Sequence, residues 1–265
     1  MRIFTVLKLS IVIPFFNEEE NVIEVLTEAR ERCPHAEILA IDDGSTDSTR
    51  ARIESTEGVR LVGFARNLGQ SAALYAGLVR ATGEICVMMD GDGQNDPADI
   101  PALVAALSEA DVVCGFRRTR QDDWRRRIAS RVANRIRSAV LKDGIRDTGC
   151  SLKAVRREHI GYLVPFNGLH RFMPALLKNA GLSLLEVPVN HRPRLRGTSK
   201  YTIAGRAMRG IRDLFGVQWL MSRQLRLPAE LLAPTSDTEV GGARAVVDQL
   251  TDPSVLNPSP STSSA

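Results

Sequence analysis

The sequence is short of the features that mark secreted and membrane-spanning proteins. Its 265 residues include four cysteines, and these are Cys33, Cys86, Cys114 and Cys150. They lie far apart, with no CxxC pair and no histidine at metal-ligand spacing, so free thiols in a reducing cytosol are expected. No apolar run approaches the roughly eighteen residues of a membrane-spanning helix. The apolar stretch 9–16 contains a proline and leads into acidic residues, which favours a core strand over a signal peptide.

The composition excludes a disordered or fibrous chain. With 43% hydrophobic and 25% charged residues, the chain suits one sizeable α/β domain with an appendage. The net charge is +4, but Lys and Arg outnumber Asp and Glu by fourteen to four over residues 117–157 and by nine to one over 192–226. Both stretches are expected to meet something anionic. Over residues 227–265 Pro, Ser, Thr and Asp dominate without periodicity, which predicts a disordered tail.

The first half of the chain alternates β-branched runs with helical patterns, which is typical of parallel strands joined by helices. The expected strands are 10–14, 38–42, 60–64, 85–90 and 111–115. The expected helices are 19–32, 46–55, 70–81 and 100–108. This order predicts an α/β fold with a Rossmann-like, doubly wound and mostly parallel central sheet. Ligands of such sheets bind beyond the carboxyl ends of the strands.

Two basic amphipathic helices are expected after this sheet. Residues 123–142 repeat apolar side chains every four positions beside a stripe of arginines, and residues 202–225 alternate in a similar way. Such helices suit a membrane interface, with aromatic side chains at the lipid boundary and arginines toward the headgroups. The alternative is that both helices pack on the core and expose solvated charge.

The strongest chemical signal is the segment Asp90-Gly91-Asp92-Gly93-Gln94, directly after an expected strand. Two carboxylates two residues apart on a glycine-containing turn can share one hard cation and leave coordination sites open for phosphate oxygens. Mg²⁺ or Mn²⁺ is the expected ion. The alternative is an ordinary Asp/Gly turn, because both residues favour tight turns.

Two other strand ends carry polar residues, at 14–18 and 42–47. Three such ends would line one edge of the sheet, as a nucleotide site requires. Asp43 is expected to contact ribose or base. Ser45 or Thr46 is expected to cap the helix that follows.

Four segments together resemble the inverting glycosyltransferases of the GT-A fold, and these are residues 11–18, 42–45, 66–69 and 90–94. Within that group the chain is most similar to dolichyl-phosphate mannosyltransferases and undecaprenyl-phosphate glycosyltransferases, over about residues 8–215. The likeness to this polyprenyl-phosphate branch depends on residues 147–151, 170–172 and 191–201. The resemblance implies a metal-dependent hexosyltransferase that moves a mannose- or glucose-type sugar from a GDP- or UDP-linked donor to a polyprenyl phosphate, with inversion.

The resemblance also implies roles for single residues. The side chains expected to hold base and ribose are Pro14, Phe16, Glu18 and Asp43. Those expected to hold the metal and the diphosphate are Asp90, Asp92 and Gln94. Those expected to meet the donor or acceptor phosphate are Arg117, Arg131, Arg196 and Lys200. Arg118 or Arg135 offers the same chemistry and is an alternative contact.

The implied organisation is one domain over residues 1–226, with a nucleotide-binding part at about 8–116 and an acceptor and membrane-interface part at about 117–226. A phosphate nucleophile is already anionic at neutral pH, so it needs cations that bring it to the donor more than it needs a general base. The expected location is cytoplasmic, at the inner face of the cytoplasmic membrane. A small membrane-protein partner is an alternative means of anchoring.

Three other functions compete with this interpretation. The same fold could transfer sugar to a polysaccharide or a soluble hydroxyl, but a base would then be needed and none is obvious outside the two aspartates. A basic nucleic-acid-binding protein would explain the pI near 9.1 but not the acidic strand ends, so no nucleic-acid partner is expected. A nucleotidyltransferase ranks last, because no glycine-rich phosphate loop with a lysine follows the first strand.

Overall fold

The computed structural model describes residues 8–117, 135–193 and 203–224. In this part of the chain, seven strands form one sheet in the order β3-β2-β1-β4-β6-β5-β7. The strands are β1 (Leu9–Phe15), β2 (Glu37–Asp42), β3 (Val59–Gly63), β4 (Ile85–Met88), β5 (Val112–Arg117), β6 (Lys153–Arg156) and β7 (Leu184–Val189). The α-helices bounded within the described residues are α1 (Val22–Arg32), α2 (Thr49–Glu54), α3 (Gln70–Arg80), α4 (Ile100–Ala106), α6 (Leu169–Asn179) and α7 (Ile203–Arg223). The predicted α/β class with a mostly parallel sheet is confirmed.

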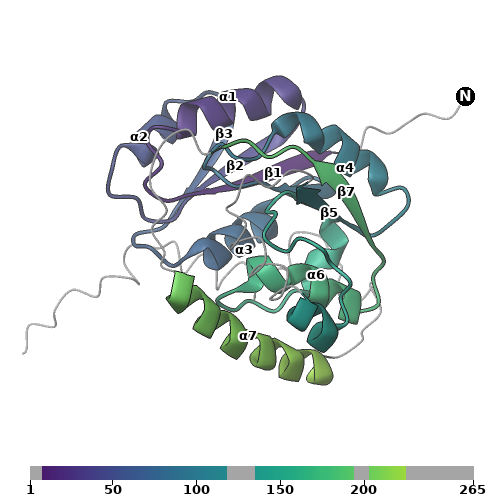
Figure 1. Cartoon of the computed structure of the whole chain (residues 1–265). Coiled ribbons are helices and arrows are strands. Elements are labelled where there is room, and N and C mark those ends of the chain that lie inside the picture. The colour runs from purple at the N-terminus through teal and green to yellow at the C-terminus, as the bar shows by residue number, and fades with distance from the viewer. Residues whose placement is uncertain (1–7, 118–134, 194–202, 225–265) are drawn as a thin grey trace, which may run out of the picture.

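Helices cover both faces of the sheet, which explains why its strands are apolar runs rather than alternating ones. In Figure 1, α1, α2 and α4 lie on one face, and α3, α6 and α7 lie on the other. Successive β1 residues supply the two cores in turn, because Ile11 and Ile13 pack under α1 while Val12 packs under α3. All three side chains are fully buried.

The sheet departs from a purely parallel arrangement at β6. This strand is antiparallel to both neighbours. Its first residue, Lys153, lies opposite Met88 of β4 and opposite Cys114 of β5. The remaining pairs, including β5 with β7, are parallel. Because β6 runs the other way, its first residue lies at the edge where the parallel strands end. The loop that precedes β6 is thereby brought to the edge where ligands were expected.

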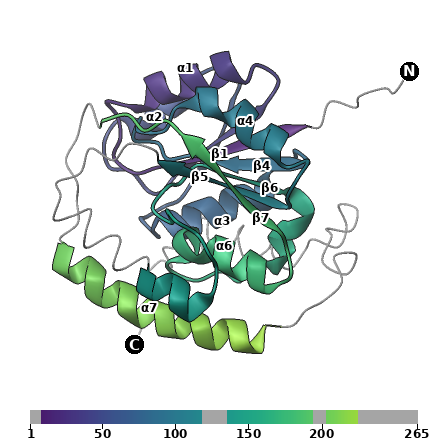
Figure 2. The same cartoon turned by 45° about the vertical axis from the view of Figure 1, so that its right-hand side comes forward.

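The second of the two expected amphipathic helices is confirmed as α7, which crosses beneath α3 and α6 in Figures 1 and 2. Leu214 and Val217 are buried against the α6 side of the core, whereas Phe215 and Trp219 are 61% and 64% exposed. Of the first expected helix, residues 135–141 are helical, and 118–134 lie outside the described residues. The expected tail at 227–265 also lies outside them and stays a prediction. No helix in the described ranges is long and apolar enough to cross a membrane.

Candidate functional site

The strand ends that carry polar residues meet at one edge of the sheet, as the sequence predicts. β1 pairs in parallel with both β2 and β4, so their carboxyl ends point the same way. The amide of Asp43 donates a 2.8 Å hydrogen bond to the carbonyl of Phe15, and that of Met89 donates to Val12 at 3.1 Å. These bonds continue the ladder beyond β2 and β4 and place the three polar segments next to one another.

The segment after β1 is held by the segment after β2. Asn17 has a positive φ of 52°, and its amide donates to Ser45 Oγ at 3.0 Å. Its Oδ1 accepts the amide of Thr46 at 2.8 Å. Ser45 therefore fixes the neighbouring loop instead of capping a helix, and the expectation of a cap at Ser45 or Thr46 is wrong: α2 begins after Ser48. The loop that carries Phe16 and Glu18 is rigidly supported.

Asp43 anchors the loop before α3. Its carboxylate accepts the amide of Leu68 at 2.7 Å, the amide of Gly69 at 2.9 Å and the side-chain amide of Asn67 at 2.9 Å. The side chain is 2% exposed. Gly44 makes this approach possible, because a Cβ there would lie 2.3 Å from the carbonyl carbon of Arg66. Asp43 therefore supports the loop at residues 67–69, and its expected contact with base or ribose stays a prediction.

Burial raises the pKa of Asp43 from 3.8 to about 6, although the amides of Leu68 and Gly69 oppose the shift. Between these values the folded chain holds a proton that the unfolded chain has released, so the Asp43 contribution to stability falls as pH rises. We predict that Asp43→Asn loses this dependence. The free energy of unfolding of the wild type minus that of the variant should fall by up to about 3 kcal/mol between about pH 4 and pH 7.

Urea unfolding of both proteins across this pH range measures the difference directly. Asp47→Asn is the matched control: at Asp47 burial is outweighed by hydrogen bonds from Thr49 and Glu19, which lower the pKa from 3.8. The free energy of unfolding of Asp47→Asn should lie below that of the wild type by a constant amount above about pH 5, and this difference should shrink only at lower pH. A constant difference between wild type and Asp43→Asn over the whole range would contradict the prediction.

The loop after β4 presents the two predicted metal-binding carboxylates. Gln70 donates from Nε2 to Asp90 Oδ1 at 2.7 Å, and the amide of Gln94 donates to Asp92 Oδ1 at 3.2 Å. Burial raises the pKa of Asp90 to about 6, and the charge of Asp92 adds to the rise. The amide of Asp90 donates to Asn95 Oδ1 at 3.0 Å, so the side chain of Asn95 holds the turn closed.

A second set of contacts fixes the far end of this loop. The amide of Arg192 donates to the carbonyl of Gln94 at 2.9 Å. The guanidinium of Arg192 lies 2.7 Å from Glu28 in α1 and 3.0 Å from Asp96. Sequence reasoning did not assign this positioning role, and it ties residues 94–96 both to α1 and to the segment after β7.

The donor set of this loop fits a hard divalent cation. Asp90 and Asp92 supply carboxylate oxygens and Gln94 an amide oxygen, which are the ligand types that Mg²⁺ and Mn²⁺ prefer. Within the described ranges, no three His, Cys, Asp or Glu side chains converge to enclose a metal by themselves. Such a cation would need further oxygens from water and from a ligand, as is usual where Mg²⁺ binds through a nucleotide's phosphates.

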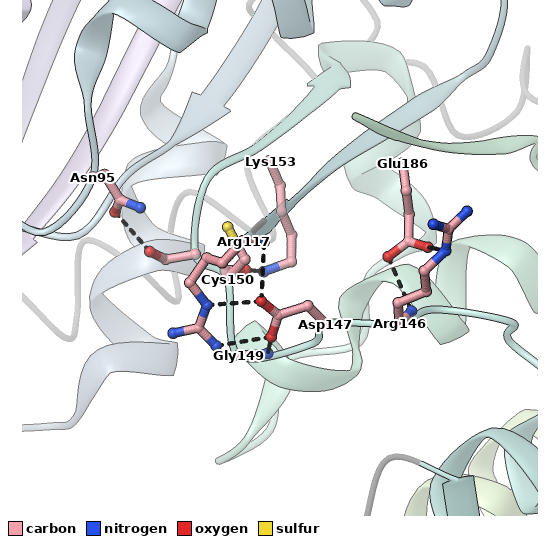
Figure 3. Close-up of polar contacts among 9 residues, drawn as sticks. Asn95, Arg117, Arg146, Asp147, Gly149, Cys150, Lys153 and Glu186 are labelled. Carbon is pink, nitrogen blue, oxygen red and sulfur yellow. Dashed lines mark hydrogen bonds and ion pairs between the residues drawn. The ribbon is translucent and has the colours of Figure 1, made fainter. Parts of the chain in front are cut away.

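Arg117 lies at the end of β5 but points its guanidinium at a carboxylate. Nε and Nη2 bind the two oxygens of Asp147 at 2.7 and 2.8 Å, and the side chains are only 13% and 9% exposed (Figure 3). The amide of Gly149 donates to the same carboxylate at 3.2 Å. Arg117 therefore orders the loop before β6, and its expected phosphate contact stays a prediction. The other three expected phosphate contacts, Arg131, Arg196 and Lys200, lie outside the described residues.

A cavity of about 480 Å³ opens beside Asp90. Its walls come from the start of α3, the end of β4, the loop before β6 and the start of α6. The lining residues are Asn67, Leu68, Gly69, Gln70, Leu74, Met88, Asp90, Thr148, Gly149, Cys150, Ser151, Lys153, Asn167, His170 and Arg171. Among the predicted site residues, Asp90 alone belongs to this lining.

Lys153 and His170 line the cavity. Lys153 was missing from the predicted site, whereas His170 lies in the segment 170–172 on which the family likeness depends. Lys153 is 3% exposed and donates from Nζ to the carbonyl of Cys150. Burial, with the charges of Arg171 and Lys153, lowers the pKa of His170 to about 3, so the ring is neutral at physiological pH. His170 Nδ1 lies 2.8 Å from Ser71 Oγ, which accepts the amide of Gly168 at 2.9 Å. The sequence signal for Lys153 was a lysine inside the otherwise apolar run 152–155.

A mostly parallel α/β sheet with an aspartate-bearing loop and a cavity at its carboxyl edge is typical of transferases with the GT-A architecture. The chain belongs to glycosyl transferase family 2, whose model matches residues 10–163. The dodecaprenyl-phosphate galacturonate synthase of Rhizobium johnstonii is 38% identical over 83% of this chain and 69% of its own length. The undecaprenyl-phosphate 4-deoxy-4-formamido-L-arabinose transferase of Enterobacter sp. is 37% identical over 74% of this chain and 63% of its own length.

Solved structures support the fold. The glucosyl-3-phosphoglycerate synthase of Mycobacterium tuberculosis, solved in complex with Mn²⁺, UDP and glucosyl-3-phosphoglycerate, aligns with a TM-score of 0.62. The alignment covers 83% of this chain and 80% of that one, at 22% identity. The same enzyme with Mn²⁺, UDP-glucose and phosphoglyceric acid also has a TM-score of 0.62. At this identity the likeness establishes the architecture alone.

Proposed function

We propose that this glycosyltransferase moves a sugar from a nucleoside diphosphate to a polyprenyl phosphate, with inversion at the anomeric carbon. The observation that carries the proposal is the cavity beside the loop that bears Asp90 and Asp92, because its lining combines the carboxylate of Asp90 with the cationic side chains of Lys153 and Arg171. A site for two anionic reactants needs positive charge on both sides of the transferred sugar. The two curated relatives support a lipid phosphate as acceptor, because their names describe polyprenyl-phosphate products.

In this proposal Asp90, Asp92 and Gln94 hold Mg²⁺ or Mn²⁺, and the ion neutralises the charge that develops on the departing diphosphate. Pro14, Phe16 and Glu18 face the base and ribose of a GDP- or UDP-linked donor. The sequence favoured a mannose- or glucose-type sugar. The relatives widen the choice, because their names describe galacturonate and 4-deoxy-4-formamido-L-arabinose.

The protonation states in the cavity favour a phosphate acceptor over a hydroxyl. A hydroxyl nucleophile needs a general base whose pKa lies near the working pH. His170 is a poor candidate, because its pKa is lowered to about 3. Among the described lining residues, Asp90 is the carboxylate, and the proposal assigns it to the cation. A phosphate monoester is already ionised at neutral pH and needs no such base.

The exposed face of α7 supports a peripheral contact with the inner face of the cytoplasmic membrane. Phe215 and Trp219 are four residues apart and therefore share one face of the helix. Both side chains are more than half exposed, while Leu214 and Val217 hold the opposite face to the core. Aromatic side chains of this kind favour the boundary between lipid headgroups and acyl chains. A small membrane-protein partner is a second way to keep the chain there.

A transfer assay tests the proposal. Purified full-length chain with Mn²⁺ is offered UDP-glucose, UDP-galacturonate, GDP-mannose and UDP-4-deoxy-4-formamido-L-arabinose, each with a short polyprenyl phosphate or the matching polyprenol. We expect a glycolipid phosphodiester, detected by mass spectrometry, with the phosphate acceptor and not with the alcohol. Transfer to the alcohol or to a soluble sugar, with no product from the phosphate, would refute the proposed acceptor class.

A further inference from the structure

Arg171 combines a place on the cavity wall with incomplete hydrogen bonding. It lies in the first turn of α6, next to His170. Its Nε is buried and has no hydrogen-bond partner among the described residues. Its Nη2 lies 3.5 Å from Oδ2 of Asp213 in α7, and the two side chains are 39% and 25% exposed. An ion pair that is this long and this accessible to water is weak.

Lys153 adds a second cationic group to the lining of the same cavity. Its ammonium group has three N–H donors, and the hydrogen bond described for it goes to the carbonyl of Cys150. A lysine that is 3% exposed is costly to bury unless its charge and donors are matched. Two cationic side chains therefore line the cavity: Lys153 is buried and Arg171 is partly exposed.

Asp213 has an unusual position for an acid. The stretch 192–226 contains nine Lys and Arg residues, and Asp213 is its one acidic residue. Asp213 lies close to the start of α6, because a Cβ built on Gly168 would be in ordinary van der Waals contact with Asp213 Oδ2, at 3.5 Å. The helix that carries Asp213 also exposes Phe215 and Trp219, so the acid that contacts Arg171 and the aromatic face belong to one element.

We propose that Arg171 binds the phosphate of the polyprenyl phosphate acceptor and that Asp213 occupies its guanidinium until this phosphate displaces it. The inference rests on the proposed function. A guanidinium binds phosphate oxygens through two parallel N–H bonds, which is a stronger arrangement than a single exposed ion pair. Arg171 is then an acceptor-binding residue, and Asp213 is a positioning residue that acts through it. Their substitutions should have opposite effects on acceptor binding.

Isothermal titration of the full chain with geranyl phosphate, a short polyprenyl phosphate, tests this prediction without a bilayer. Arg171→Gln should weaken binding by about tenfold or more, since a hydrogen-bonded charge is lost. Asp213→Asn should strengthen binding by about threefold or more, and the double variant should bind like Arg171→Gln. Binding of UDP with Mn²⁺ should stay within about twofold of the wild type in all three.

Arg50→Gln and Glu54→Gln are the matched controls, because Arg50 and Glu54 form an exposed 3.2 Å ion pair on α2. Neither control should change geranyl phosphate binding. The inference is overturned if Arg171→Gln binds as the wild type does, or if Asp213→Asn binds no more tightly. It is also overturned if the gain from Asp213→Asn persists in the double variant. Because Asp213 is partly exposed, its variant tests the idea even where Arg171→Gln is poorly folded.

Phospholipid headgroups carry a related phosphate, and vesicles of phosphatidylglycerol distinguish the two sources. Arg171→Gln should bind these vesicles as the wild type does, while a loss of vesicle binding with unchanged geranyl phosphate binding would overturn the inference. If the wild type binds UDP with Mn²⁺ but no geranyl phosphate, the proposed acceptor fails and the inference fails with it. If wild type and Arg171→Gln bind geranyl phosphate equally, the inference alone fails.

Discussion

Asp92→Asn is expected to lower transfer by at least about a thousandfold while leaving the thermal unfolding temperature unchanged. The side chain of Asp92 is partly exposed and accepts one described hydrogen bond, from the amide of Gln94 at 3.2 Å. The amide oxygen of asparagine can accept the same bond, so the loop keeps its shape. The negative charge that attracts the cation is lost, and the donor diphosphate loses its counterion.

The experiment measures three quantities on the same protein: turnover, Mn²⁺ affinity in the presence of UDP, and melting temperature. Glu109→Gln, an exposed acid after α4, serves as the control for removing one negative charge. We expect Mn²⁺ affinity and turnover to fall together in Asp92→Asn and to stay unchanged in the control. Turnover that persists in the variant, or that survives a chelator in the wild type, would place the cation elsewhere or remove it from the reaction.

The predicted strands and helices of the first half agree with the structure because each satisfies a local rule. Apart from the edge strand β3, the strands of the first half are mainly apolar runs buried on both faces, and the helices between them have one buried stripe. Their bounds differ by at most three residues, as at α1, which begins at Val22 rather than Glu19, and at α2, which begins at Thr49 rather than Thr46. Short-range pattern was sufficient to place these elements along the chain, although the order of β4 and β5 in the sheet depends on crossovers.

The second half contains elements that local pattern did not reveal. β6 has four residues and begins with a lysine, so its sequence is weak evidence for a central strand. Its antiparallel direction depends on the path of the chain between residues 117 and 153, which no periodicity encodes. α6 contains Pro174, a residue that normally argues against a helix interior. These elements form through packing between distant segments, and together with the loops that precede them they line about half of the cavity.

At the site, the sequence predicted which edge of the sheet is functional but not which partner each side chain meets. Asp43 was expected to face a ligand, and nothing in the sequence indicated that its carboxylate would accept three donors from residues 67–69. The partners lie twenty-four to twenty-six residues away, so the spacing of the acidic motif carried no information about them. The same holds for Arg117 and Asp147, which are thirty residues apart.

The pair formed by Arg117 and Asp147 allows a structural role to be separated from a catalytic one. Removing one partner leaves an unpaired charge in a largely buried position, which typically costs about 3 to 5 kcal/mol of stability. We therefore expect both Arg117→Met and Asp147→Leu to lower the free energy of unfolding in urea by about that amount. Replacing both partners with apolar side chains removes the unpaired charge, so the double variant Arg117→Met with Asp147→Leu should recover at least half of the loss.

Activity of the double variant then decides what Arg117 does. If its guanidinium also contacts a phosphate, as the family resemblance implies, transfer should stay at least about a hundredfold below the wild type although stability is regained. If Arg117 serves only to hold the loop that contains Gly149, transfer should return together with stability. The comparison uses one double-mutant cycle read in two ways, by urea unfolding and by turnover at saturating donor. Because the loop borders the cavity and leads into Lys153, recovery of both readings would assign the phosphate contact to cations other than Arg117.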